Sequence, residues 1–401
     1  METHPAPRRV LPAIVLAQLL GTAPWFAVNA VMPQLRADYG WPASALATLS
    51  SAIQWGFIAG TLVFALLALA DRHSARRVFL ICALAAAGST LASAAFASNY
   101  AALIGWRVAT GFFLAGIYPV GMKLAALWFP RGLGAALGWL VGALVVGSAS
   151  AHALRALSLQ FGGQAPWAFV FVGVAVAAAA AGLIVIALVP EPAHAAAPAG
   201  GLRLGALRRI WTDRRLRASA FGYFGHMVEL YTLWVLVPLI LATRLAGAST
   251  LSWWAFGVLA AGALGCMGGG LLVKRWGSAR VAAVQLAVSG ACCFAAPWLL
   301  GAPLALFLAW MVLWGITVAG DSPQFSALSA SNAPRDAVGS VLTLVNSIGF
   351  AISALSIEFF VRWAEHAPLA QVLPWVGLGP VVGLLMLRPL LARDVTETPP
   401  R

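Results

Sequence analysis

The chain has 401 residues, of which 61% are hydrophobic and only 9% are charged. A soluble domain carries roughly a quarter charged residues, so this composition excludes a water-surrounded fold and predicts that lipid is the solvent. The formal net charge of +13 lies mostly in arginines between apolar stretches, where a positive excess reports membrane topology. We therefore expect the lipid bilayer as a partner and no nucleic acid.

Twelve apolar stretches follow one another along the chain. They are apolar on all sides and about 20 residues long, which predicts membrane-spanning helices and excludes an outer-membrane barrel. The first stretch follows METHPAPRRV without a clear cleavage site, so we expect a helix there and not a removed signal peptide. The predicted spans are 10–31, 44–70, 78–97, 101–122, 133–154, 167–189, 218–241, 251–272, 281–299, 304–326, 338–361 and 370–388.

The two halves of the chain repeat each other. Residues 67–77 read LALADRHSARR and return as GLLVKRWGSAR at 270–280, while Gly111-x3-Ala115-Gly116-x2-Pro119 returns as Gly315-x3-Ala319-Gly320-x2-Pro323. Internal repeats of this size are typical of secondary transporters, which hold their substrate between the repeats. We predict an all-α membrane protein with two pseudo-symmetric six-helix bundles, 1–189 and 218–401, joined by a linker at 190–217.

The arginines and lysines predict the orientation. Twelve spans place both termini on one side of the membrane, and that side carries 19 cationic residues against 4 on the other. By the positive-inside rule both termini are expected to be cytoplasmic. The linker opens with EPAHAAAPAGG and closes with LRRIWTDRRLR, a basic amphipathic piece that we expect to lie on anionic headgroups.

Two motifs resemble those of a known family. The loop Leu67-x3-Asp71-Arg72-x-Ser74-x-Arg76-Arg77 is similar to the G-x3-D-R-x-G-R-R loop of the major facilitator superfamily, although Leu67 and Ser74 replace its glycines. Arg107-x2-Thr110-Gly111 is similar to the R-x2-Q-G pattern on the fourth helix of that family. The resemblance covers nearly the whole chain and places it in a bacterial subgroup, loosely near the cyanate/nitrite-type porters. It implies a twelve-helix transporter of the bacterial inner membrane, working by alternating access.

The resemblance also implies a cytoplasmic gate. In the family, charged side chains of the two corresponding loops pair and close the cytoplasmic side. The alternative is that these residues are only topology signals. The gate residues carried over to this chain are Asp71, Arg72, Arg76, Arg77, Lys274, Arg275 and Arg280.

The family's cavity is lined by helices 1, 4, 7 and 10, and spans 4, 7 and 10 of this chain contain ionisable residues. Such a residue costs roughly 2.5–3.5 kcal/mol at membrane depth, so it should face water or a partner. Arg107 is a candidate anion clamp; alternatively it bonds backbone carbonyls to pack helices. Asp321, two residues before Pro323, is a candidate substrate contact, with a gate or packing role as the alternative.

Glu229 is the candidate proton site, with His226 one turn before it on the same helix face. A carboxyl group in an apolar site can load and release a proton as its surroundings change. The alternatives are a structural acid paired with His226 or Arg107, and a hydrogen-bonded core histidine. Trp25, Asn29 and Tyr118 are expected to shape the substrate-binding cavity.

The sequence lacks a Walker loop, a nucleophile elbow and a cluster with metal spacing, so we expect neither an enzyme nor a cofactor or metal. The predicted function is proton-coupled secondary transport of a small, anionic solute by a monomer. The first alternative is a proton-coupled exporter of drugs or amphipathic metabolites. The fifth helix lacks the G-P-x2-G-G stretch of drug/proton antiporters, which weighs against it. The second alternative is a membrane receptor or sensor without transport.

Overall fold

The structure is a computed structural model that describes residues 7–129, 133–161, 167–191, 202–203 and 205–392. Within this part all regular structure is helical, and twelve helices are long and apolar enough to cross a membrane. The predicted all-α, twelve-span fold is confirmed. The elements of the first half are α1 (Val10–Thr22), η1 (Ala23–Phe26), α2 (Ala27–Tyr39), α3 (Ala45–Leu66), α4 (Leu69–Arg72), α5 (Ala75–Ala95), α6 (Tyr100–Leu114), α7 (Tyr118–Trp128), α8 (Leu133–Phe161) and α9 (Ala168–Leu188).

The second half follows a short helix, α10, within the predicted linker. Residues 192–201 and 204 lie outside the described part of the chain, so the domain boundaries at 190–217 stay a prediction. The remaining elements are α10 (Gly205–Thr212), α11 (Arg214–Ala242), α12 (Ala248–Trp276), α13 (Ser278–Leu299), α14 (Leu304–Gly320), α15 (Ser322–Asn332), α16 (Val338–Ala364), α17 (Leu369–Val376) and α18 (Leu378–Leu391).

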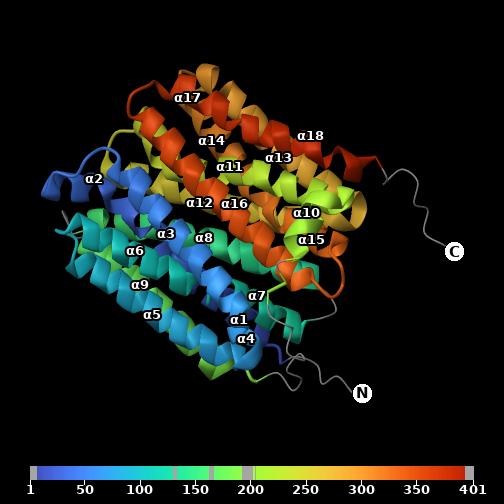
Figure 1. Cartoon of the computed structure of the whole chain (residues 1–401). Helices are drawn as coiled ribbons and strands as arrows, with labels where there is room; N and C mark the ends of the chain where they lie inside the picture. Colours follow the sequence, from blue (N-terminus) through green and yellow to red (C-terminus); the bar gives the residue numbers. More distant parts are fainter. Residues whose placement is uncertain (1–6, 130–132, 162–166, 192–201, 204, 393–401) are drawn as a thin grey trace.

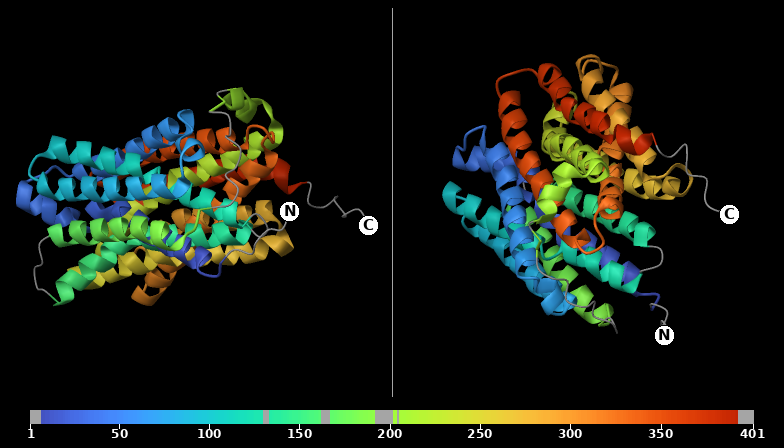
Figure 2. Two further views of the ribbon diagram at one scale, coloured as in Figure 1. Left: turned by 90° about the horizontal axis from the view of Figure 1, so that it is seen from below. Right: turned by 45° about the vertical axis from the view of Figure 1, so that its right-hand side comes forward.

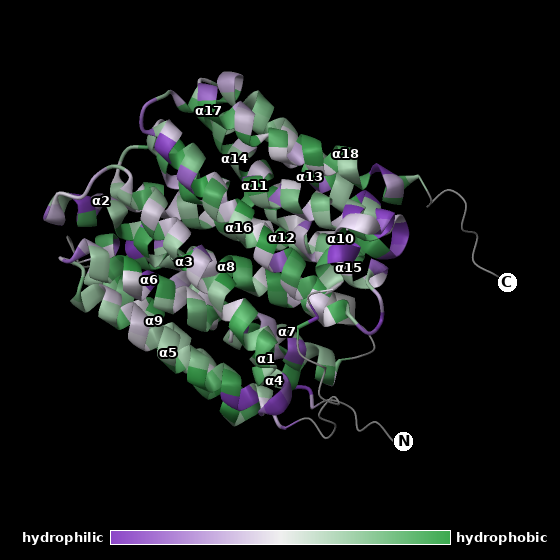
Figure 3. Ribbon diagram, in the orientation of Figure 1, coloured by the Kyte–Doolittle hydropathy of each residue, from purple (hydrophilic) through white to green (hydrophobic). Residues whose placement is uncertain are grey.

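The helices gather on two sides of a common boundary (Figure 1; Figure 2). Across it, α8 packs along α12, and α3 packs along α16. We call the end of the bundle at which α9 stops and α11 starts the linker end; α1 also begins there, and α18 ends there. The opposite end, where α2 stops and α17 starts, is the far end. Between the two ends the outside of the bundle is largely apolar (Figure 3), as a lipid-facing surface must be.

Several spans are interrupted near their middle and continue beyond their predicted ends. Span 1 contains the 3-10 turn η1 with Pro24 and continues to Tyr39. Spans 4 and 10 break just before Pro119 and Pro323 and then resume to Trp128 and Asn332. Proline lacks the backbone N–H and its ring clashes with the carbonyl four residues earlier, which weakens the helix at these points. Pro33 and Pro238, by contrast, lie inside helices that continue.

The sequence repeat corresponds to one helix crossing that is made twice. An added Cβ on Gly111 of α6 would lie 2.0 Å from the Ile53 carbonyl oxygen of α3. In the second half an added Cβ on Gly315 of α14 would lie 2.1 Å from the Val258 carbonyl oxygen of α12. Only glycine lets the two backbones approach this closely. The repeated glycines therefore hold the same crossing in each half, next to the break before each proline.

Gly265→Ala should destabilise the protein strongly, because the added Cβ would lie 1.9 Å from the Ile316 carbonyl oxygen and push α12 and α14 apart. We expect a loss of about 1–3 kcal/mol in unfolding free energy, as for other overpacked cores. Thermal unfolding of the purified protein in detergent measures it. Gly268→Ala on the same helix is the matched control, since nothing lies within 4 Å of its added Cβ. Equal melting temperatures for the two variants would contradict the tight crossing.

Candidate transport site

An aromatic layer joins the two halves at the middle of the bundle. The Trp25 ring stacks on the Tyr231 ring with 5.9 Å between centroids, and Phe57 meets Phe350 at 4.5 Å. Phe26 completes the layer from η1 and contacts the second half at 5.5–6.2 Å. Span 1 and α3 supply the rings of the first half, while α11 and α16 supply those of the second. The layer closes the centre of the molecule.

A small cavity adjoins this layer and lies between the halves. It holds about 20 Å³, which is room for about one water molecule. None of its lining residues is charged. Tyr118, Tyr223 and Tyr231 line the cavity, and the buried indole N–H of Trp234 has no hydrogen-bond partner among the described residues. The lining residues are Tyr118, Val141, Leu144, Val145, Tyr223, Met227, Leu230, Tyr231, Trp234, Ala319, Ser322 and Phe350.

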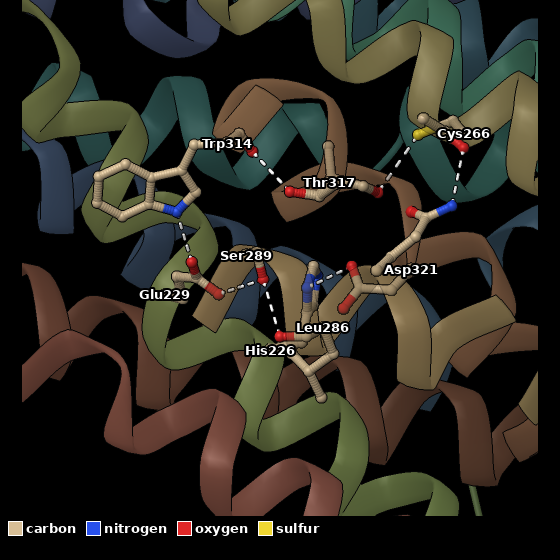
Figure 4. A network of polar contacts seen from close by, with 11 residues as sticks. His226, Glu229, Cys266, Leu286, Ser289, Trp314, Thr317 and Asp321 are labelled. Atoms are coloured by element: carbon tan, nitrogen blue, oxygen red, sulfur yellow. Dashed lines mark hydrogen bonds and ion pairs between the residues drawn. The ribbon is translucent and has the colours of Figure 1, made fainter. Parts of the chain in front are cut away.

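Glu229 lies fully buried on α11 and points into the second half (Figure 4). Its Oε1 accepts hydrogen bonds from Trp314 Nε1 at 2.6 Å and from Cys293 Sγ at 3.2 Å. Its Oε2 accepts one from Ser289 Oγ at 2.8 Å. All three donors are neutral, and neither His226 nor Arg107 contacts the carboxylate. An ionised carboxylate in apolar surroundings costs several kcal/mol without a counter-charge, so this site favours a carboxyl group that can take up a proton.

His226 and Asp321 form a second buried pair about one helical turn from Glu229 (Figure 4). His226 Nδ1 lies 2.8 Å from Asp321 Oδ1, and both side chains are fully buried. The distance fits an ion pair, although the geometry is poor for a hydrogen bond. His226 Nε2 and Asp321 Oδ2 have no hydrogen-bond partner among the described residues. Asp321 occupies the break between α14 and α15, where backbone groups are released from helical bonding.

Arg107 is fully buried on α6 and contacts the interrupted first span. Its Nη1 donates to the Pro24 carbonyl oxygen at 3.1 Å, and its Nη2 donates to the Trp25 carbonyl oxygen at 2.6 Å. In this state both terminal nitrogens are thus taken by backbone groups that the turn η1 releases. The anion clamp stays a prediction. The geometry matches the alternative, in which Arg107 bonds backbone carbonyls and packs helices together.

The other residues predicted for the cavity are dispersed. Tyr118 lines the cavity, and the ring of Trp25 belongs to the aromatic layer. Asn29 lies apart from both: its Nδ2 donates to Ser50 Oγ at 3.0 Å. The structure thus brings Tyr118, Trp25 and Asp321 to the centre of the molecule, while Arg107 and Asn29 bond within the first half.

The predicted gate residues lie at the linker end. None of the ion pairs described for them joins the first half to the second half. Asp71 pairs with Lys123 at the inner end of span 4. Arg76 Nη1 lies 3.2 Å from Glu191 Oε2. Arg72, Arg77, Lys274 and Arg275 are exposed, and Arg280 also lies at this end, at the start of α13. A charge pair across the two halves therefore stays a prediction for a state closed at the linker end.

A polar ladder instead links the halves at the far end. Ser51 Oγ donates to Glu358 Oε1 at 2.6 Å, and Arg362 Nη2 donates to Thr48 Oγ1 at 3.0 Å. Arg362 Nε also donates to Glu358 Oε2 at 2.6 Å. Deeper along the same helices, Gln54 Nε2 donates to a serine of α16. The structure is therefore a state that is held closed at the far end by α3 and α16.

Glu358→Gln should loosen this closure, because the amide cannot keep the ion pair with Arg362 or accept as strongly from Ser51. A cysteine is introduced by Ala52→Cys, one turn from Thr48. We expect a membrane-impermeant thiol reagent, added at the far end, to label this cysteine faster in the Glu358→Gln variant than in the protein that keeps Glu358. The protein without the introduced cysteine gives the background. Asp38→Asn is the control, because Asp38 bonds only Trp167 within its own half. Unchanged labelling rates would contradict the ladder's role.

The sequence analysis missed the partners of Glu229. None of Ser289, Cys293 and Trp314 was predicted as a partner. Ser289 and Cys293 lie one turn apart on one face of α13, and Trp314 lies one turn after Trp310 on α14. Polar groups at such spacing in an otherwise apolar span indicate a shared partner. Identifying that partner needed the packing of three helices.

Comparisons with known proteins agree with this architecture. The family model of the Major Facilitator Superfamily matches residues 14–357. The chain therefore belongs to the Major Facilitator Superfamily. It is a multi-pass membrane protein, and family and fold point to a secondary transporter rather than to an enzyme. A search of curated proteins finds no matching relative.

Solved structures share the fold at low sequence identity. The proton:xylose symporter XylE is 14% identical with a TM-score of 0.75, covering 96% of this chain and 95% of that one. The human organic anion transporter MFSD10 (TETRAN) is 15% identical with a TM-score of 0.71, covering 96% and 100%. A bacterial homologue of the human lysosomal transporter Spinster, in an inward-facing and occupied conformation, is 16% identical with a TM-score of 0.66, covering 98% and 96%. At these identities the likeness concerns the fold alone.

Proposed function

We propose that this protein is a proton-coupled secondary transporter that moves a small amphipathic organic solute across the bacterial inner membrane. The observation that carries the solute class is the lining of the central cavity, where tyrosine hydroxyls and the Trp234 indole lie among apolar side chains. Hydrogen-bond donors in an apolar site suit an apolar body with hydrogen-bond acceptors. The small inorganic anion considered from the sequence fits less well, because it would enter without a counter-charge.

Proton coupling is proposed to reside in Glu229. Its three neutral donors can stabilise the carboxyl group in either protonation state, because the Ser289 hydroxyl can donate or accept. Leu230, the next residue on α11, lines the central cavity. Rotation or displacement of α11 on solute binding would therefore move Glu229 as well. His226 is proposed to assist Glu229, because it lies one turn away on α11 and pairs with Asp321 at the break of span 10.

An organic anion is the second candidate solute, and two observations favour it. Arg107 holds the carbonyl of Trp25, whose ring belongs to the central layer, and Arg107 Nε has no hydrogen-bond partner among the described residues. A movement of η1 in another state would free the terminal guanidinium nitrogens for a carboxylate. The fold is also similar to that of a human organic anion transporter.

The proposed mechanism is alternating access by two bundles. The polar ladder between α3 and α16 closes the far end in this state, and the loops around Asp71 and Arg275 are proposed to close the linker end in the other. We propose that the linker end is cytoplasmic, because it carries the excess of arginines. A monomer suffices for this mechanism, since the cavity lies between the halves of one chain.

Proton flux into proteoliposomes that contain a pH-sensitive dye tests the proposal. The panel holds aromatic carboxylates, neutral aromatic amides, hydrophobic cations and small inorganic anions. Flux triggered by the neutral or carboxylate aromatics supports the proposed solute class, and the balance between the two separates the candidates. Flux triggered only by inorganic anions would overturn it. Binding of a panel compound, with no proton flux triggered by any compound of the panel, would support the sensor alternative.

A further inference from the structure

The short helix α10 has an unusual position at the linker end. It ends at Thr212, and the spanning helix α11 begins only two residues later, at Arg214, with Asp213 capping its first turn. Because α11 crosses the membrane, a helix joined to its start must lie at the level of the lipid headgroups. Ala206 and Ile210 are buried against the protein, where α10 packs on α11 and α16.

Two apolar side chains of α10 are left uncovered next to this buried stripe. Leu207 is 39% exposed and Trp211 is 51% exposed, and they lie one turn apart on one face. The Trp211 ring also packs edge-on against the Phe221 ring, with 5.1 Å between centroids. Phe221 is seven residues into α11, about 10 Å along its axis. The indole therefore reaches along the spanning helix toward the bilayer, where tryptophan is favoured.

The same region carries a concentration of cationic side chains without acidic partners. Arg208, Arg209, Arg214, Arg215 and Arg217 are all exposed. Asp213 accepts from the backbone amides of residues 215 and 216, and Arg217 Nη1 donates to the Trp211 carbonyl oxygen. The described structure contains no ion pair to any of these five arginines, whereas Arg203 nearby pairs with Asp336. Exposed guanidinium groups beside an exposed indole match the phosphates of anionic lipids.

We propose that α10 and the first turn of α11 form a binding surface for anionic phospholipids. The five arginines hold the headgroup phosphates, and Leu207 and Trp211 contact the upper acyl chains. Each basic side chain near the surface adds to the attraction, and the attraction weakens with ionic strength. Because the surface lies on the linker and the start of span 7, bound lipid would anchor the helix that carries Glu229. The proposal does not depend on the identity of the solute or on proton coupling.

Quenching of tryptophan fluorescence by brominated lipids tests this surface. The full chain is reconstituted in phosphatidylcholine vesicles with increasing fractions of brominated phosphatidylglycerol or, separately, brominated phosphatidylcholine. The difference between the protein and its Trp211→Phe variant isolates the signal of Trp211. We expect stronger quenching by the anionic lipid at equal fraction, and a loss of that preference at high salt. R208Q/R209Q should reduce the preference by about thirtyfold, from the contribution of two basic residues.

The matched control is K274Q/R275Q, which removes two exposed cations from the linker end of another helix, α12. This double variant should keep the preference for the anionic lipid. An equal loss in both double variants would overturn the proposal in favour of a general surface potential. Equal quenching by the two lipids would show that the surface does not prefer an anionic lipid, which would also contradict the proposal. Absence of quenching by either lipid would place Trp211 in water and would also overturn it.

Discussion

Glu229→Gln should abolish accumulation of the solute against its gradient while counterflow exchange of the same solute continues. The amide has the shape of the protonated carboxyl group, and its oxygen can still accept from Trp314 Nε1. Its NH₂ group can donate to the Ser289 hydroxyl, which now accepts. The fold is therefore preserved, but the side chain can no longer load and release a proton. Uptake driven by an imposed pH gradient, compared with exchange at equal pH, measures the two activities.

Glu365→Gln is the matched control, because this carboxylate lies just beyond α16 at the far end, outside the network around Glu229. It should keep both activities. Loss of exchange as well as accumulation in Glu229→Gln would assign the residue a structural role. Full gradient-driven uptake in that variant would move the proton site elsewhere, with Asp321 as the next residue to replace.

Arg107→Ala should destabilise the protein, even in the absence of any solute. The change removes two hydrogen bonds that a charged donor makes to the buried carbonyls of Pro24 and Trp25, the first of which keeps the backbone N–H of Ala27. Hydrogen bonds to charged groups contribute about 1.5–3 kcal/mol each in proteins and less between helices in membranes, so we expect a loss of about 2–4 kcal/mol. Thermal unfolding of the purified, ligand-free protein measures it.

Arg107→Lys separates this packing role from anion binding. Lysine keeps the charge and can donate to one of the two carbonyls, so the melting temperature should fall between those of the wild-type protein and the alanine variant. A wild-type melting temperature for Arg107→Ala, together with lost affinity for an aromatic carboxylate, would favour the clamp predicted from the sequence. The packing role would then be wrong.

Composition and periodicity predicted the architecture well, because lipid allows few alternatives. Spans must be helical and long, and their order along the chain determines the number of crossings. The ends of the spans were predicted less well. Spans 4 and 10 resume at Tyr118 and Ser322, and their final segments contain more polar residues, such as Lys123 and Asn332. A hydrophobic pattern ends where such residues begin, although the helix continues.

The residues of the candidate site that could be predicted most directly are its ionisable residues. Glu229, His226 and Asp321 could be found because an ionisable residue is rare in an apolar span. Their partners were not predictable, since serine, cysteine and tryptophan are ordinary residues there. A pairing of Glu229 with His226 was one of the alternatives considered from their spacing on one helix, but the two side chains point to different neighbours. The spacing of residues along one helix determines on which face of that helix a side chain lies. It does not determine which residue of another helix the side chain contacts.

The aromatic layer at the centre has a consequence for leakage. Five ring contacts cross the boundary between the halves: Trp25–Tyr231, Trp25–Phe350, Phe26–Tyr231, Phe26–Trp234 and Phe57–Phe350. At roughly 1 kcal/mol each, their separation costs about 5 kcal/mol. Moving one proton through a potential of 100 mV releases about 2.3 kcal/mol. A proton alone therefore does not open the empty protein, and an amphipathic solute that replaces these contacts lowers the barrier. In the proposed mechanism, the same rings that select the solute would also suppress uncoupled proton flow.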